Sequence, residues 1–345
     1  MKVAWLARCC QCGPGPKPPM VRAALVSYVL CGLILSRWPI ASGLSAGLRR
    51  LDMISDILAI IAPVMIIAFI GYVWERRGLS FDNTMVTPLV INVGNPCLLL
   101  SAMLSTHPDL AVLARIAGGT VLVMALTAVV SWAILRALGQ PLRTFLPAMV
   151  FGNTGNMGLP LCLFAFGPPG LALAVAYFAV QSVLQFSIGE GVSSGHVSWR
   201  SVFKSPALYA ILIGCALIEA DVTLPKFLTN TITTIAGLTI PLMLLSLGTA
   251  LARLKVVGFR RSIMFSLFRL GGGFVLGLAV AWLLGLEGAA RGAVVVQSTM
   301  PSAVFNYLFA ARYDNRPEEV AGIVFISTVM SFLALPLLMA FVLTF

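Results

Sequence analysis

From residue 54 onward the chain consists of long apolar runs, separated by short segments that hold most of the charged side chains. A helix that crosses a bilayer needs about 20 mostly apolar residues, and these runs have that length. The pattern therefore predicts an all-α polytopic membrane protein of about ten transmembrane helices. We expect the spans at about residues 54–74, 85–104, 111–135, 144–166, 170–189, 205–220, 230–252, 263–284, 289–311 and 319–343.

Composition and charge agree with a lipid environment. Hydrophobic residues make up 59% of the chain and charged residues 10%, whereas a soluble domain has about 25% charged residues. The net charge is +11, but seven basic residues and one acidic residue precede Met53. The remaining 16 basic and 11 acidic residues leave the hydrophobic part at +5. Nucleic-acid binding is therefore a poor interpretation, and the lipid bilayer is the expected partner.

Residues 1–52 differ in kind from the rest, with a cluster of Cys, Gly and Pro followed by an apolar run at 23–35. That run is too short to span a bilayer comfortably. It is compatible with a signal-peptide core or an arginine-rich targeting segment. We favour an amino-terminal extension, disordered or produced by a misplaced start, because Met53 stands where the first helix is expected.

Basic residues are distributed unevenly over the expected loops. Alternate loops place twelve on one side and three on the other, and the positive-inside rule puts the richer side in the cytoplasm. This predicts a cytoplasmic loop between helices 5 and 6, at residues 191–204, with both termini outside. The three residues on the poorer side are Arg115, Lys226 and Arg291.

The two halves carry traces of a duplication. Pro96 and Pro241 are 145 residues apart, as are the starts of the segments 152–156 and 297–301, and Pro63 precedes Pro206 by 143. We therefore expect two inverted five-helix repeats at 53–190 and 205–345, an arrangement common among secondary transporters. A chance coincidence of prolines in apolar helices is the alternative.

The fourth span contains residues that disfavour a continuous helix. Glycine costs about 1 kcal/mol and proline about 3 kcal/mol in a helix interior. Broken backbone is tolerated at membrane depth only where protein buries it or it lines a wet cavity. The ninth span repeats the feature, so we expect broken crossover helices 4 and 9. The residues concerned include Asn153, Thr154, Asn156, Pro160, Thr299, Pro301 and Asn306.

Such a crossing points the amino-terminal ends of half-helices inward, each equivalent to about +0.5 elementary charge, and this favours a bound anion. The polar residues of the two breaks are therefore candidate substrate-binding residues. The alternative is that they satisfy only the broken backbone. Tyr177 and Gln181, four residues apart on one helical face, either join that site or hydrogen-bond between helices. Scaffold or gate roles are expected for Asn92, Asn95, Pro96 and Pro241.

Other chemistry is scarce. Arg269 is expected to snorkel to the cytoplasmic surface, although attraction of substrate anions is the alternative. The cysteines and the two histidines lack a metal-binding spacing, so no metal and no cofactor are expected. A phosphate-binding loop of the ATPase type is also missing, and no enzymatic activity is expected.

From Met53 to Phe345 the chain resembles the auxin efflux carrier family, in its bacterial permease branch. The resemblance lies in Asn95-Pro96, the break from Asn153 to Pro160, Pro206 with Gly214, Pro241 with Leu247-Gly248, Met300-Pro301, and Ser331 with Pro336. It implies a scaffold part and a transport part, substrates such as indole acetic acid, malate or malonate, and a bacterial inner membrane.

The sequence therefore predicts a secondary transporter that moves a small organic anion by alternating access. A cation/proton antiporter of similar fold, dependent on Asp56 or Glu190, is the alternative, and a membrane receptor is a third class. A homodimer is left open.

Overall fold

The computed structural model describes residues 39–196, 206–254 and 256–344, with side chains from residue 55 onward. The amino-terminal extension up to residue 38, and residues 197–204 of the expected cytoplasmic loop, lie outside the described residues. The chain divides into two compact units, Met1–Asp56 and Ile57–Phe345. All packing described below lies within the second unit.

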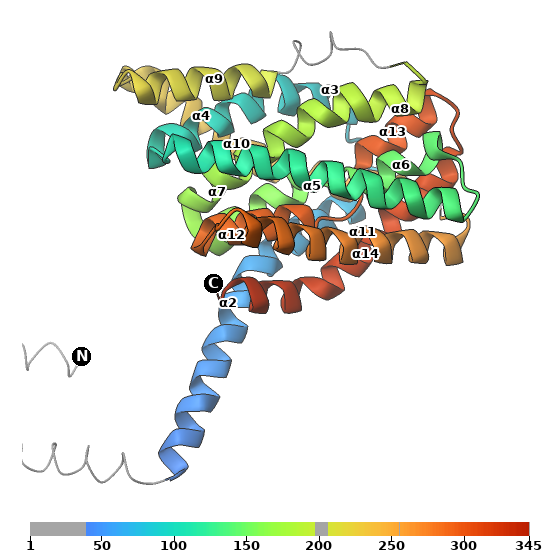
Figure 1. Cartoon of the computed structure of the whole chain (residues 1–345). Helices are drawn as coiled ribbons and strands as arrows, with labels where there is room; N and C mark the ends of the chain where they lie inside the picture. Colours follow the sequence, from blue (N-terminus) through green and yellow to red (C-terminus); the bar gives the residue numbers. More distant parts are fainter. Residues whose placement is uncertain (1–38, 197–205, 255, 345) are drawn as a thin grey trace, which may run out of the picture. The chain divides into compact units, whose positions relative to one another are not determined.

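Helices account for almost all of the described residues (Figure 1). Seven helical stretches among them are long and apolar enough to cross a membrane, which agrees with a polytopic membrane protein. The α-helices are α2 (Pro39–Arg76), α3 (Asn83–Leu89), α4 (Asn95–Thr106), α5 (Leu110–Ala137), α6 (Leu142–Val150), α7 (Leu159–Leu184), α8 (Glu190–Ser194), α9 (Pro206–Glu219), α10 (Lys226–Arg253), α11 (Phe259–Leu283), α12 (Gly288–Ser298), α13 (Val304–Arg312) and α14 (Pro317–Val342).

Two boundaries differ from the expected spans. The described part of helix α2 starts at Pro39, so helical backbone already precedes residue 54, where the first span was expected. Helix α7 covers parts of the fourth and fifth expected spans. Its backbone turns at Gly167, where φ is +67°, just before two consecutive prolines. Glycine adopts that conformation without a steric penalty.

The core lies where α7 packs against α12, α5 and α4, and where α11 packs against α12 and α14. Figure 1 shows α11 in orange and α14 in red running side by side. Small residues allow close approach of some helices. A Cβ on Gly248 of α10 would lie 1.9 Å from the Ala68 carbonyl oxygen of α2, so these two backbones are in direct contact.

Candidate functional site

Two helical segments are interrupted, one at Phe151–Asn153 and one at Thr299–Ala303. The second interruption lies where the sequence predicted it. The first coincides with only the amino-terminal edge of the break predicted from Asn153 to Pro160, because Thr154 to Pro160 are helical. Helix α6 ends at Val150, and the next helical residue is Thr154. Helix α12 ends at Ser298, and α13 begins at Val304. The residues between are extended or irregular. Two short pieces of non-helical backbone are thus flanked by four helix ends.

These two pieces cross and pair with each other through their backbones. Gly152 and Ser302 form an isolated antiparallel bridge. The flanking hydrogen bonds run from Asn153 N to Pro301 O at 2.7 Å and from Ala303 N to Phe151 O at 3.1 Å. Backbone groups that leave a helix inside a membrane protein need partners within the protein. The crossing provides them from the other broken helix.

Buried amide side chains complete the crossing. Asn306 Nδ2 donates to the Phe151 carbonyl oxygen at 2.9 Å and to Ser302 Oγ at 3.0 Å, and its Oδ1 accepts from Gln185 at 3.2 Å. Gln181 Nε2 donates to the Gly152 carbonyl oxygen at 2.6 Å and to Thr154 Oγ1 at 2.7 Å. In this conformation the Asn306 amide and the Gln181 amino group are bonded to the protein itself.

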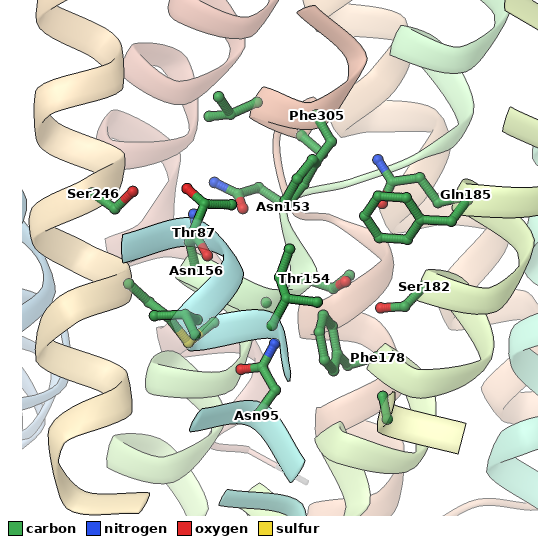
Figure 2. A pocket seen from close by; sticks show the side chains of 18 of the residues that line it. Thr87, Asn95, Asn153, Thr154, Asn156, Phe178, Ser182, Gln185, Ser246 and Phe305 are labelled. Atoms are coloured by element: carbon green, nitrogen blue, oxygen red, sulfur yellow. The ribbon is translucent and has the colours of Figure 1, made fainter. Parts of the chain in front are cut away.

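A cavity of about 310 Å³ lies beside the crossing. Figure 2 shows side chains from α3, α4, α7, α10, α13 and the first non-helical piece around it. Its polar lining comprises Thr87, Asn92, Asn95, Asn153, Thr154, Asn156, Ser182, Gln185, Glu190 and Ser246. Its apolar lining includes Phe178, Phe186 and Phe305.

Three π-helical segments contribute to the wall of this cavity. They are η2 (Val90–Gly94), η3 (Thr154–Gly158) and η4 (Gln185–Gly189). π-Helical turns are rare and are often found at functional sites. Here three separate helices depart from regular geometry at the same cavity, which marks it as the candidate binding site.

Two buried amide atoms at the cavity have no hydrogen-bond partner among the described residues. They are Asn153 Nδ2, a donor, and Asn95 Oδ1, an acceptor. Buried polar atoms in proteins are normally hydrogen-bonded, so these two atoms have unused hydrogen-bonding capacity beside the cavity. Figure 2 shows both side chains at the cavity, Asn153 from the crossing and Asn95 from α4.

Charge is sparse at the cavity, since Glu190 is the one charged residue among the described residues that line it. Its carboxylate accepts hydrogen bonds from Arg312 at 3.1 Å and from the Tyr313 hydroxyl at 2.8 Å. The apolar part of the lining comes from aromatic side chains. The rings of Phe186 and Phe305 pack edge to face, with their centroids 5.1 Å apart. The lining therefore suits a ligand that has a large apolar part and a small polar group.

The residues predicted from the sequence fall into two groups. The cavity is lined by Asn153, Thr154 and Asn156, and by Asn92 and Asn95, which were expected in a scaffold or gate. The others lie outside its lining, and their roles stay predictions. These are Pro160 at the start of α7, Thr299 and Pro301 in the second non-helical piece, Tyr177, Gln181 and Asn306 in the packed interior, and Pro96 and Pro241 within α4 and α10.

Several lining residues were missed by the sequence analysis. Phe178, Ser182 and Gln185 follow the spacing i, i+4, i+7, which places them on one face of the helix. The predicted pair Tyr177 and Gln181 lies one residue earlier, a rotation of about 100° at 3.6 residues per turn. Tyr177 and Gln181 therefore lie on the adjacent face of α7, outside the lining of the cavity.

The expectation that Arg269 snorkels to the surface is wrong. Its side chain is 1% exposed, and Nη1 donates to the Ser298 carbonyl oxygen at 3.1 Å. A Cβ on Gly152 would lie 2.2 Å from Arg269 Nη2, so the guanidinium lies directly against the crossing. Helix α11 packs on α12, and this directs the side chain inward.

Comparisons with known proteins agree with a membrane function. Residues 56–190 and 191–339 match the family described as Membrane transport protein. An uncharacterized transporter of Methanothermobacter thermautotrophicus is 27% identical over 298 residues, 80% of this chain and 95% of the relative. One from Methanocaldococcus jannaschii is 27% identical over 202 residues, 54% of this chain and 64% of the relative. Auxin efflux carrier component 1 of Arabidopsis thaliana is 24% identical over 127 residues, 35% of this chain and 20% of the relative.

Proposed function

Because the chain belongs to the auxin efflux carrier family of membrane transport proteins, we propose that it is a secondary carrier for a small organic anion. The observation that carries the proposal is the cavity at the crossing, with its unpartnered Asn153 amide donor. The helical segments that begin at Thr154 and Val304 present backbone N–H groups and the positive end of a helix dipole there. A carboxylate is the ligand group that suits these donors.

The proposed substrate is a monocarboxylate with a flat apolar body, of the auxin-like type. A volume of about 310 Å³ is at the small end of the range for ligand sites. Phe178, Phe186 and Phe305 offer aromatic contact to the body of the ligand. A second carboxylate, as in malate or malonate, would meet no Lys or Arg among the described lining residues. It would also approach the negative charge of Glu190.

The proposed architecture has ten crossings arranged as two inverted repeats, 53–190 and 205–345. The interrupted segments α6–α7 and α12–α13 support this proposal, because one interruption falls in each proposed repeat. In this proposal the crossed helices form the transport part, and its movement against the scaffold part exposes the cavity to either side in turn. The loop 191–204 is then cytoplasmic and the termini are outside, as the distribution of basic residues favours.

Uptake into proteoliposomes tests this function. Labelled indole acetic acid and labelled phenylacetate should enter vesicles that contain the full chain. Their uptake should be faster than that of labelled malate or malonate. Asn153→Ala should weaken apparent affinity about 10- to 100-fold, the value of one hydrogen bond to a charged group. Asn230→Ala, which removes an exposed amide from α10, is the matched control and should leave uptake unchanged. Uptake that is equal in the Asn153 variant and the wild type would refute the site.

A further inference from the structure

The crossing brings together helix ends of both signs. Two amino-terminal ends, at Thr154 and Val304, each carry the equivalent of about +0.5 elementary charge. Two carboxyl-terminal ends, at Val150 and Ser298, each carry about −0.5. The four contributions cancel, so the crossing alone has almost no net charge to distinguish an anion from a neutral molecule.

Arg269 changes this balance. Arginine remains protonated in proteins, and its Nη1 donates to the carbonyl oxygen of Ser298, at the carboxyl-terminal end of α12. The positive charge therefore lies against one of the two negative helix ends. With the guanidinium included, the net charge of the crossing becomes about +1.

The guanidinium is not neutralised by an acidic group. The four ion pairs found among the described residues do not include Arg269. Its Nε and Nη2 atoms are buried and have no hydrogen-bond partner among those residues. Tyr177 lies close enough to interact electrostatically, but its phenol is neutral in ordinary conditions. A fully buried cation without a counter-charge is costly, which suggests that its field has a use.

The position of the guanidinium relates it to the cavity. Gly152 lines the cavity, and a Cβ on Gly152 would lie 2.2 Å from Arg269 Nη2. Arg269 itself is not part of the lining. The charge therefore lies behind a single layer of backbone, where it acts on a ligand without touching it.

We propose that Arg269 is the residue that makes this site selective for anions, by offsetting a negative helix end so that the positive ends at the cavity act unopposed. The inference rests on the proposed function, because it concerns the same ligand. Arg269 is thus a specificity-determining and positioning residue rather than a direct ligand. Arg269 should raise the affinity for a carboxylate ligand and leave the affinity for the corresponding uncharged amide unchanged.

Binding of phenylacetate and of its neutral isostere phenylacetamide tests this inference. The full chain in phosphatidylcholine nanodiscs is titrated with each by calorimetry. A unit charge about 7 Å from the carboxylate, at an effective dielectric constant of about 20, changes affinity roughly 50-fold. Arg269→Met should therefore weaken phenylacetate binding roughly 50-fold and leave phenylacetamide binding unchanged. Arg269→Lys keeps the charge and should restore most of the preference, whereas Arg115→Met removes an exposed arginine and should change neither.

A second variant keeps the guanidinium and cancels its charge. Ser266 is buried on α11, three residues before Arg269 and on the same face, so Ser266→Asp places a carboxylate beside it. This variant should also lose the preference for phenylacetate, and it decides the matter if Arg269→Met does not fold. Equal weakening of both ligands, or an unchanged preference in both variants, would overturn the inference. Failure of the wild type to prefer phenylacetate or indole acetic acid over the matching amide would instead overturn the proposed function.

Discussion

Three consecutive glycines in α11, Gly271, Gly272 and Gly273, face different surroundings and allow a sharp test of the packing at the crossing. A Cβ on either of the first two would meet no atom within 4 Å. A Cβ on Gly273 would lie 2.1 Å from the Ser298 carbonyl oxygen and 2.9 Å from Arg269 Nη1. Only the third glycine is therefore required for the close approach of α11 and α12.

The size of the effect follows from these contacts. The carbonyl of Ser298 belongs to the backbone of α12, so it cannot rotate away, and the helices must separate by about 1 Å for a methyl group to fit. Overpacking of this kind costs up to about 3 kcal/mol. Alanine gains about 1 kcal/mol over glycine in a helix interior. Gly273→Ala should therefore lose about 2 kcal/mol of unfolding free energy, whereas Gly271→Ala and Gly272→Ala should gain about 1 kcal/mol each.

Thermal unfolding of the three purified variants in one detergent, followed by tryptophan fluorescence, measures the difference. For a chain of this length, with about 2.1 cal/mol/K of unfolding entropy per residue, a gap of about 3 kcal/mol corresponds to roughly 4 °C in Tm. Gly273→Ala should have the lowest Tm and should also reduce uptake in proteoliposomes, because Ser298 and Arg269 are displaced. A Tm for Gly273→Ala equal to that of its two neighbours would refute the close contact on which this reasoning depends.

The remaining predictions concern the buried Asn306 amide and the contact between Tyr313 and Glu190, which lines the cavity. Asn306→Ala should lower the unfolding free energy by about 1–3 kcal/mol, because the buried Gln185 amide loses its acceptor and Phe151 and Ser302 each lose one donor; thermal unfolding checks this, and an unchanged Tm would contradict it. The hydrogen bond from Tyr313 to Glu190 raises the pKa of the phenol above its ordinary value. The stabilisation by the neutral phenol is therefore present below about pH 10 and is lost as pH rises through the raised pKa. Ultraviolet titration should show late ionisation of Tyr313, and Glu190→Gln should move it toward the ordinary range; no change would contradict the contact.

The broken helices were the part of the site that the sequence predicted best. Asn153 and Pro301 lie in the two non-helical pieces, and the local preferences that predict such breaks can be read from a single chain. Gly155 and Pro160 were also expected to break the fourth span, but they lie in η3 and in the first turn of α7, where proline is tolerated. The predicted break also identified Asn153, Thr154 and Asn156, which line the cavity. The sequence could therefore predict those features that depend on residues close to one another along the chain.

The rest depended on contacts between distant segments. The inward direction of Arg269 is set by α12, and nothing in the sequence around it distinguishes a buried from a snorkelling arginine. The cavity face of α7, with Phe178 and Ser182, is chosen by packing against the crossing. The π-helical segments are likewise invisible in the sequence, because a single wide turn leaves no periodicity of its own.

The pairing of Gly152 with Ser302 has a consequence for how this site can be altered. The joint between the two broken helices is made there by main-chain atoms, with hydrogen bonds that every non-proline residue can form. These backbone hydrogen bonds do not depend on the side chains that line the cavity. If the proposed site is correct, substitutions of Asn153, Phe178 or Phe305 change which ligands the cavity binds and leave the hydrogen bonds between the two broken helices intact.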